Sequence, residues 1–320
     1  MTLPLVSILI ATYNHEDFIR ETLQNVVEHD YNNLEIVVTD DGSTDRTQEI
    51  ISEFAEKYPE KIVAILHREN AGISANHAKG LVRCTGKYVV IQDGDDVLLP
   101  GKIAQQVFIM EADSEVVISY HDVDVFESET NETLFIWSER IGTRTGNVRT
   151  LVRYGPFMCL ISIMIRREWV PEYGYDDRLR NIGDWYLLVE VLYKSKGKIA
   201  YLDKVLARYR RHTKNVTSDW ERKFTDGFLT LALIESQWAE LVHDVRLRRS
   251  ELYVMIAIYA WQNISKKTAI HLLGEAMRLS FPNPFPWWRL AWREGIYFLT
   301  SGRTDYLIKT LLQKKGREQL

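Results

Sequence analysis

Residues 6–14 read VSILIATYN, and this stretch is the clearest indication of the class of fold. The part from Val6 to Thr12 is almost entirely apolar or β-branched, which is typical of a strand that helices cover on both faces of a parallel sheet. It has no basic leader and no small-residue cleavage site, so we interpret it as a buried strand and not as a signal peptide. Tyr13 and Asn14 then mark the end of this strand.

Strands and helices alternate along the first third of the chain. The first helix is indicated by Ile19, Leu23, Val26 and Val27, which fall on one helical face. Further strands are expected at Glu35–Thr39, Ile62–Leu66 and Tyr88–Gln92, and further helices at Thr47–Tyr58, Ser74–Thr85 and Lys102–Glu111. This alternation predicts an α/β fold with a Rossmann-like, doubly wound and mostly parallel sheet. Ligands of such sheets bind beyond the carboxyl ends of the strands.

The rest of the chain has a different pattern. Shorter strands are expected at Val116–Tyr120, Ile161–Ile165 and Ile199–Tyr209, which predicts a mixed second half of the same domain. After Asp219 the pattern is helical. We therefore predict one domain over residues 1–218 and a helical C-terminal region over residues 219–320.

The composition is that of a globular protein. Of 320 residues, 46% are hydrophobic and 26% are charged, and the net charge of −4 argues against a nucleic-acid binder, which would carry a strongly basic domain. Cys84 and Cys159 are too few for a disulfide scaffold or a four-thiolate zinc site, and they fit a reducing compartment. No apolar run reaches the roughly 18 residues that a membrane-spanning helix needs. We therefore expect a cytoplasmic protein.

Asp93, Asp95 and Asp96 are the first candidates for a chemical role. They follow the strand expected at Tyr88–Gln92, and such close carboxylates repel one another unless water or a cation neutralises them. Mg²⁺ or Mn²⁺ is the expected cation, because these ions bind one or two carboxylates and complete their coordination with water and substrate phosphates. A solvated acidic turn is the alternative that this segment alone leaves open.

Asp40 and Asp41 also follow an expected strand. Asp45 and Gln48, a little further on, could cap the next helix. Asp40 or Asp41 would still be available to accept a hydrogen bond from a base N–H or a ribose hydroxyl, as acidic residues do in nucleotide-binding folds. The alternative is an Asx turn that leads into the helix.

Four segments in this order closely resemble the motifs of family 2 glycosyltransferases, which have the glycosyltransferase-A fold. They are VSILIATYN at 6–14, VVTDDGSTD at 37–45, ENAGIS at 69–74 and QDGDDVLLP at 92–100. The resemblance implies an inverting enzyme that moves a sugar from a nucleotide diphosphate donor, with a UDP-sugar expected, to a hydroxyl of a glycan or lipid-linked acceptor. Cell-surface polysaccharide synthesis is the implied setting, and residues 1–218 would hold both the donor and the acceptor.

The resemblance also implies which residues bind the donor. Thr12 and Tyr13 match the segment that holds the nucleobase, and Asp41 matches the aspartate that bonds the ring N–H of the base. The residues expected to bind the donor are Thr12, Tyr13, Asn14, Asp40, Asp41, Asn70, Gly72, Asp93, Asp96 and Arg211.

The metal site is implied by two separate segments. Asp95 would bind the ion, Asp93 would contact the ribose or the metal shell, and Asp96 would be a supporting carboxylate. The segment RYRRHTKN at 208–215 is similar to a family segment in which a histidine completes the metal site and basic groups face the diphosphate. His212 and Arg211 are the matching residues, and a solvated basic loop is the alternative.

One position departs from the family pattern. After Gly72 the family often has an arginine and an asparagine, where this chain has His77 and Ala78. We expect His77 to be a histidine on a helix surface rather than a ligand. Asn70 and Gly72 match the pattern.

Asp184 is the expected general base. It precedes an amphipathic helix in the segment GDWYLL at 183–188, which is similar to the family's E-D-W-D-L motif. The base would accept the proton of the acceptor hydroxyl as its oxygen attacks the anomeric carbon from behind, and this displacement inverts the anomeric centre. An ordinary helix N-cap is the alternative role.

The C-terminal tail combines Trp287, Trp288 and Trp292 with a surplus of basic residues. Such a composition suits the headgroup layer of an anionic membrane and would allow peripheral contact at the inner face. Core packing of the helical region explains the aromatic residues as well, and the tail could also be the contact face of a homodimer.

Two other functions are left open. A sugar nucleotidyltransferase would need a Gly-rich basic loop after the first strand, and the sequence has none there. A non-catalytic module that binds a nucleotide sugar would keep donor binding but transfer nothing.

Overall fold

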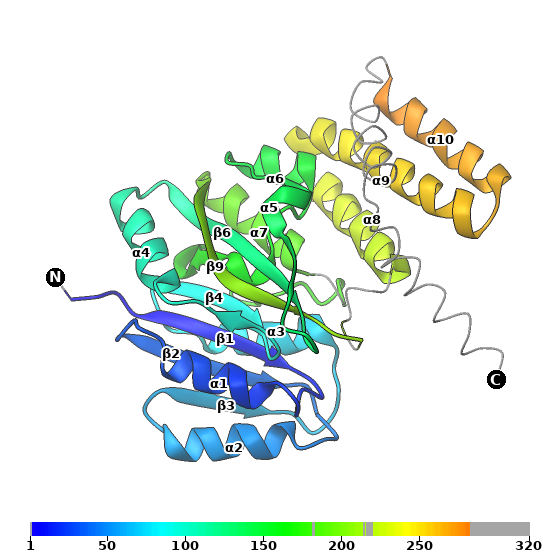
Figure 1. Cartoon of the computed structure of the whole chain (residues 1–320). Helices are drawn as coiled ribbons and strands as arrows, with labels where there is room; N and C mark the ends of the chain where they lie inside the picture. Colours follow the sequence, from blue (N-terminus) through cyan, green and yellow to red (C-terminus); the bar gives the residue numbers. More distant parts are fainter. Residues whose placement is uncertain (1, 181–182, 214, 216–219, 282–320) are drawn as a thin grey trace, which may run out of the picture. The chain divides into compact units, whose positions relative to one another are not determined.

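The computed structural model of the protein describes residues 2–180, 183–213, 215 and 220–281 (Figure 1). The chain falls into two compact units, Met1–Leu241 and Val242–Leu320. Helix α8 (Trp220–Gln237) belongs to the first of these units, whereas the sequence grouped residues 219–320 together.

The first unit contains the sheet and most of the helices. Its strands are β1 (Val6–Thr12), β2 (Leu34–Asp40), β3 (Ile62–Leu66), β4 (Tyr88–Asp93), β5 (Val97–Leu98), β6 (Val116–Glu127), β7 (Thr133–Ile136), β8 (Met164–Arg166) and β9 (Lys198–Arg211). Its helices, besides α8, are α1 (Ile19–Val27), α2 (Thr47–Lys57), α3 (Ile73–Arg83), α4 (Lys102–Ala112), α5 (Trp137–Ile141), α6 (Val148–Tyr154) and α7 (Asp184–Ser195).

The strands of the described residues form one sheet in the order β3-β2-β1-β4-β8-β6-β9-β5, with β7 paired to β6 beside this path. β1 runs parallel to both of its neighbours, β2 and β4, and β2 runs parallel to β3. β8 is antiparallel to both β4 and β6, and it joins this first half to the parallel pair of β6 and β9. The predicted α/β fold with a doubly wound, mostly parallel sheet is confirmed.

Helices cover both faces of the sheet because side chains alternate along each strand. Ile8 and Ile10 of β1 point into a core that includes residues of α1, α2 and α4. Leu9, between them, points to the opposite face, where α3 packs. A Cβ atom added to Gly80 of α3 would lie 2.3 Å from Leu9 Cδ1, so the close approach of α3 to β1 depends on this glycine.

The carboxyl ends of the central strands lie at one level. Thr12 of β1 pairs with Asp40 of β2, and Ala11 pairs with Asp93 of β4. The turn after β2 needs Gly42, which has a φ of 73° and whose Cβ atom would lie 2.8 Å from the backbone of Glu69. The polar segments that follow the three strands are therefore brought to the same edge of the sheet.

β6 is much longer than the strand expected at Val116–Tyr120. The extension contains Asp122 and Asp124, whose carboxylates have partners except for Asp124 Oδ1, which has no hydrogen bond among the described residues. Asp122 accepts hydrogen bonds from the backbone N–H groups of Val123 and Ser138, and Asp124 pairs with Arg208 of β9 at 2.8 Å. β9 lies along this whole extension, so its last residues reach the end of the sheet where β4 finishes.

The second unit contains α9 (Val242–Asn263) and α10 (Lys266–Ser280), which pack against each other. Ser250 Oγ donates to the carbonyl of Ala276 at 2.8 Å, and Val254 and Ala276 are buried together. Among the described helices, none has the length and apolar character to cross a membrane. The aromatic and basic tail beyond Phe281 lies outside the described residues, so the predicted membrane or dimer contact of this tail stays a prediction.

Candidate active site

A cluster of carboxylates stands directly after β4. One side-chain oxygen from each of Asp93, Asp95 and Asp96 lies within 4.8 Å of the others. Asp95 and Asp96 are buried, whereas the side chain of Asp93 is 42% exposed. Burial, followed by the charges of Asp95 and Asp93, raises the pKa of Asp96 well above its usual range. The cluster therefore has an excess of negative charge that a cation would relieve.

Arg210 supports this cluster from the end of β9. Its Nε donates to the backbone carbonyl of Asp95 at 2.7 Å, and its backbone N–H donates to Asp96 Oδ1 at 3.0 Å. Its Nη2 pairs with Glu21 of α1 at 2.6 Å. The loop that carries the carboxylates is thus fixed by a residue more than a hundred positions later in the chain, and no local pattern in the sequence predicts such a contact.

His212 reaches the cluster from the residue after β9. Its Nε2 lies 2.8 Å from Asp95 Oδ2, and Asn215 Nδ2 lies 3.4 Å from the same oxygen. The imidazole stacks on the ring of Phe18 with 4.7 Å between centroids. The guanidinium carbon of Arg210 lies 5.1 Å from the centroid of that same ring. Phe18 therefore supports both of the β9 residues that contact the carboxylate loop.

The atoms gathered here suit a divalent cation. Carboxylate oxygens and an imidazole nitrogen are ligands that Mn²⁺ accepts, and Mg²⁺ prefers the oxygens. Asp95 and His212, the two predicted ligands, lie side by side although they come from distant segments. Asp93 faces solvent, which leaves room for water and phosphate oxygens. The residues present fit the predicted ion, and their service as ligands stays a prediction.

Asp41 organises the segment that precedes α3. Its Oδ1 accepts the backbone N–H of Ala71 at 2.8 Å, and its Oδ2 accepts that of Gly72 at 2.9 Å. Asn70 Oδ1 also accepts the Gly72 N–H, at 3.1 Å. Gly72 has a φ of 96°, which favours glycine at this turn. Three predicted donor-site residues are thereby brought together, and each carboxylate oxygen of Asp41 keeps a further lone pair for a ligand N–H.

Asp40 has a different environment from its neighbour. It is completely buried, and its carboxylate accepts hydrogen bonds from the backbone N–H and hydroxyl of Ser43 and from Gln48 Nε2. These bonds build the turn between β2 and α2, which is the Asx-turn role that the sequence left open. Its predicted contact with the donor stays a prediction.

The end of β1 faces the same space. The Thr12 hydroxyl is buried and has no hydrogen-bond partner among the described residues, and Gly94 leaves room beside it, since a Cβ there would lie 2.7 Å from Thr12 Oγ1. Tyr13 is 42% exposed, so its ring is accessible to a nucleobase. Asn14, with a φ of 53°, accepts the Thr44 N–H at 2.9 Å and so ties this turn to the one after β2.

Asp184 is the first residue of α7, and Gly183 occupies the N-cap position. Its side chain lines a small hollow with apolar residues of the segment before β8, among them Met158 and Ile163. Burial raises the pKa of Asp184, while the nearby charge of His77 opposes this shift. A carboxylate with a raised pKa is a stronger proton acceptor than an ordinary aspartate.

His77 does not lie on the helix surface, and the expectation that it would is wrong. It is 3% exposed, its Nε2 lies 3.6 Å from Asp93 Oδ1, and its ring lies 5.2 Å from that of Tyr175. Ser74, His77 and Leu81 share the buried face of α3, and this spacing was the signal in the sequence that could have placed it.

Asn76 of α3 has a structural role that no pattern in the sequence indicates. Its Nδ2 donates to the carbonyl oxygens of Thr12 at 3.3 Å and Thr39 at 3.2 Å, and its Oδ1 accepts the Thr39 hydroxyl at 2.7 Å. A buried amide therefore holds the ends of β1 and β2 together beneath the site.

Comparison with known proteins shows the family of the chain. The family model described as glycosyl transferase family 2 matches residues 7–174, a stretch that contains the ends of β1, β2 and β4 and the carboxylate cluster. The chain belongs to glycosyltransferase family 2. As a family 2 glycosyltransferase it has the glycosyltransferase-A fold, and the resemblance seen in the sequence motifs is confirmed.

Relatives and solved structures agree with this assignment. The uncharacterized protein Mb1547 of Mycobacterium bovis is 30% identical over 272 residues, which cover 80% of this chain and 73% of that protein. The putative teichuronic acid biosynthesis glycosyltransferase TuaG of Bacillus subtilis is 28% identical over 220 residues, 68% of this chain and 82% of that one. The fold is similar to S. aureus TarS 1-349 in complex with UDP-GlcNAc, with a TM-score of 0.64 and 16% identity over 86% of this chain and 81% of that one.

Arg211 is the basic residue that the family resemblance selected for the diphosphate. Strand alternation sends Arg210 and Arg211 of β9 to opposite sides, and it is Arg210 that contacts the carboxylate loop. The guanidinium carbon of Arg211 lies 5.9 Å from the ring of Tyr209. A donor contact of Arg211 in this family 2 glycosyltransferase stays a prediction.

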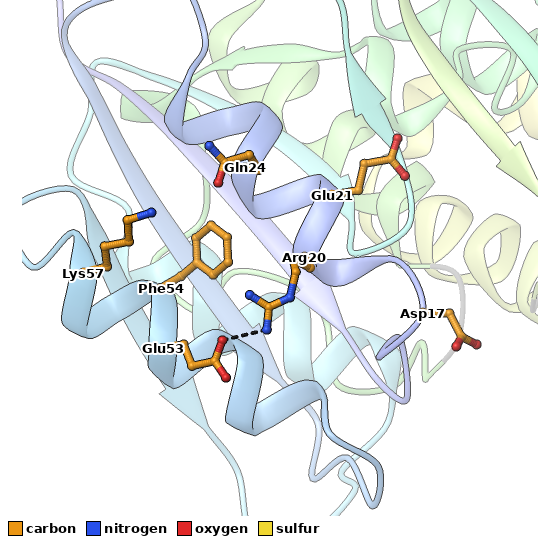
Figure 2. Close-up of a pocket in the computed structure, with 7 residues that line it drawn as sticks. All are labelled: Asp17, Arg20, Glu21, Gln24, Glu53, Phe54 and Lys57. Carbon is orange, nitrogen blue, oxygen red and sulfur yellow. Dashed lines mark hydrogen bonds and ion pairs between the residues drawn. The ribbon is translucent and has the colours of Figure 1, made fainter.

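A groove between α1 and α2 contains none of the predicted site residues (Figure 2). Its volume is about 570 Å³, and Arg20 and Glu53 form an ion pair of 2.6 Å across it. Figure 2 shows Glu21, another lining residue, turned away from this pair. Glu21 is the residue that holds Arg210, so α1 separates this groove from the site of the family 2 glycosyltransferase.

Proposed function

We propose that the protein is a metal-dependent, inverting glycosyltransferase that moves a sugar from a nucleotide diphosphate donor to a hydroxyl of a glycan or lipid-linked acceptor. One observation carries the proposal. The carboxylates that follow β4 stand next to His212 on one side and next to His77, which packs against Tyr175, on the other. This arrangement supports a cation site at the edge of the sheet where ligands of this fold bind, with Asp184 as the base close to it.

Asp95 and His212 would hold Mg²⁺ or Mn²⁺, with Asp93 contacting the ribose or the metal shell and Asp96 as support. A bound ion supplies stabilisation of the negative charge that develops on the departing diphosphate. Thr12 and Tyr13 would place the base, and Asp41, together with Asn70 and Gly72, would bind its edge. Figure 1 shows these segments converging where the β1 and β4 arrows end, near α3.

Asp184 would act on the acceptor. Its carboxylate takes the proton of the attacking hydroxyl while the sugar is displaced from behind, which inverts the anomeric centre. The apolar hollow beside Asp184 would keep water away from the reacting oxygen. Donor and acceptor would then both be held by residues 1–218.

The names of similar proteins support a choice of substrates. TarS was solved with UDP-GlcNAc, and TuaG is named for teichuronic acid biosynthesis, so a UDP-sugar donor and a cell-surface polysaccharide acceptor are the first to test. A lipid-linked acceptor would bring the enzyme to the inner face of the cytoplasmic membrane. The predicted contact through the C-terminal tail and a homodimer remain parts of this proposal.

The decisive experiment measures donor binding and transfer together. Calorimetry with UDP, GDP and TDP sugars, with and without Mn²⁺, identifies the donor, and transfer is then assayed with a panel of polysaccharide acceptors. A chelator should abolish both signals and Mn²⁺ should restore them. Sugar nucleotide binding that is indifferent to divalent ions would refute the metal site.

The Asp184→Asn variant tests whether the protein is a glycosyltransferase, a non-catalytic binding module or a sugar nucleotidyltransferase. An enzyme of this mechanism keeps donor affinity in this variant and loses transfer, by about 10²- to 10⁴-fold for a general base. A binding module shows no transfer to lose in the unaltered protein. A nucleotidyltransferase is identified by pyrophosphate release from a nucleoside triphosphate and a sugar phosphate.

A further inference from the structure

His77 lies where three parts of the site meet. Its Nδ1 lies 3.0 Å from the carbonyl oxygen of Ile73, one turn earlier in α3. Because a carbonyl can only accept, Nδ1 carries the hydrogen of this bond, and the tautomer and the ring orientation are fixed by the helix. The other nitrogen, Nε2, is directed at Asp93 Oδ1, 3.6 Å away.

Tyr175 connects His77 to the start of α7, where Asp184 lies. The Tyr175 ring lies 5.2 Å from the imidazole. A Cβ atom added to Gly183, the residue before Asp184, would lie 2.6 Å from Tyr175 Cδ1 and 3.1 Å from Ser74 Oγ. The imidazole and the Tyr175 ring therefore form a continuous contact from Asp93 to the start of α7.

The first turn of α3 contacts both the segment proposed to bind the donor and the segment that precedes α7. Asp41 holds the N–H of Gly72 at 2.9 Å on the donor side, and the Ser74 N–H donates to the carbonyl of Arg180 at 3.2 Å, just ahead of α7. Both contacts lie within one helical turn of Ile73, the residue that anchors the His77 ring. The first turn of α3 therefore contacts the donor-binding segment, the imidazole and the segment before α7.

We propose that His77 is a positioning residue that connects Asp93 on the donor side, through Tyr175, to Asp184 on the acceptor side, and that it sets the orientation of the base relative to the bound donor. The inference rests on the proposed function in taking Asp184 as the base. The acting group is the imidazole itself, held by Ile73. His77 neither accepts the proton of the acceptor nor holds the donor.

His77→Gln separates this role from the others. Glutamine is polar and of similar size, yet it lacks the ring that lies against Asp93 and Tyr175. Because a small misplacement of a reacting group costs up to about 10²-fold in rate, kcat should fall by roughly 10- to 100-fold while KM for the donor and the affinity for nucleotide with Mn²⁺ change less than about threefold. In the Asp184→Asn background the same change should cost nothing further, because the effect passes through Asp184.

Two more variants complete the design. His77→Arg places a cation where the family often has arginine, and it should recover part of the lost kcat. His29→Gln removes another buried histidine, located at the end of α1 and away from the predicted site residues, and it should leave kcat unchanged. Urea denaturation of each variant shows whether the fold is intact.

A crystal structure of His77→Gln gives a readout that does not depend on turnover. The Asp184 carboxylate should be displaced in this variant and unmoved in His29→Gln. An unmoved Asp184 overturns the inference even if the activity has changed, and so does a variant whose loss is confined to nucleotide or Mn²⁺ affinity. If the unaltered protein transfers no sugar, the proposed function fails, and the position of Asp184 in the two structures still decides the role of His77.

Discussion

Arg210 should be the main support of the carboxylate loop, and replacing it tests how that loop is built. In Arg210→Met the buried stem is kept, while the bonds to the Asp95 carbonyl and to Glu21 are lost. The backbone bond from residue 210 to Asp96 survives in the variant, because it does not involve the side chain. The change therefore removes only the guanidinium.

The contacts of the guanidinium set the expected loss of stability. A buried hydrogen bond from a charged donor, here to Asp95 at 2.7 Å, is worth about 1.5–3 kcal/mol. The ion pair with Glu21 is worth at most about 1 kcal/mol, because the Glu21 side chain is 58% exposed. Contact with the ring of Phe18 adds about 0.5–1 kcal/mol. Since neighbouring terms are not additive, we expect a net loss of about 3 kcal/mol.

Urea denaturation of the unaltered protein, Arg210→Met and Glu21→Gln measures this loss. Glu21→Gln is the matched control, and it should cost less than about 1 kcal/mol because the Asp95 bond remains. Calorimetry should also show weaker Mn²⁺-dependent nucleotide binding in Arg210→Met, since Asp95 loses its fixed orientation. Equal losses of stability in the two variants, or full Mn²⁺-dependent binding in Arg210→Met, would refute this account of the loop.

Three further outcomes are expected. Because burial raises the pKa of Asp184, kcat/KM should fall as the pH drops through an apparent pKa above the usual aspartate value of about 3.9, and a profile without this acid limb would count against Asp184 as base. Burial lowers the pKa of Lys102 to about 7, so between pH 7 and 10 the unfolded chain binds a proton that the folded chain does not. The unfolding free energy should therefore rise with pH by about 1.4 kcal/mol per pH unit relative to Lys102→Met. An equal pH dependence of the unfolding free energy in the two proteins would contradict this. Gly80→Ala should lower the unfolding free energy by about 1–3 kcal/mol, because its Cβ would lie 2.3 Å from Leu9 Cδ1, and a stabilised variant would show that Leu9 can move aside.

The sequence predicted the parallel half of the sheet well because its signals are local. The strand expected at Glu35–Thr39 runs from Leu34 to Asp40, and the helix expected at Thr47–Tyr58 ends at Lys57. Continuous apolar runs and helical spacing depend on nearby residues only, which explains this agreement. The end of β6 could not be predicted in the same way, since Asp122 bonds to Ser138 and Asp124 pairs with Arg208 of another strand, and neither partner is near in the sequence.

Only part of the site could be predicted from the sequence, and that part depended on motifs. Asp95 and His212 were placed together through a family resemblance, and the structure brings them to 2.8 Å. The sequence does not show which residues of β9 face the carboxylate loop; Arg210 contacts this loop, and the donor contact of Arg211 stays a prediction. The burial of His77 agrees with the helical spacing of Ser74, His77 and Leu81, whereas its neighbour Asp93 is supplied only by the packing of α3 on the strand ends, which no local pattern shows.

The place of Phe18 has a consequence for exchanging segments between relatives. The Phe18 ring contacts both Arg210 and His212. In the sequence, however, Phe18 directly precedes α1, whereas Arg210 and His212 lie at the end of β9 and directly after it. Consider a chimera that takes residues 205–215 from another member of the family. The grafted side chains would then pack against Phe18 instead of the residue that the parent protein has at the matching position. Such a graft should therefore be designed with both segments from one parent, and homologous recombination between them should yield mostly inactive offspring.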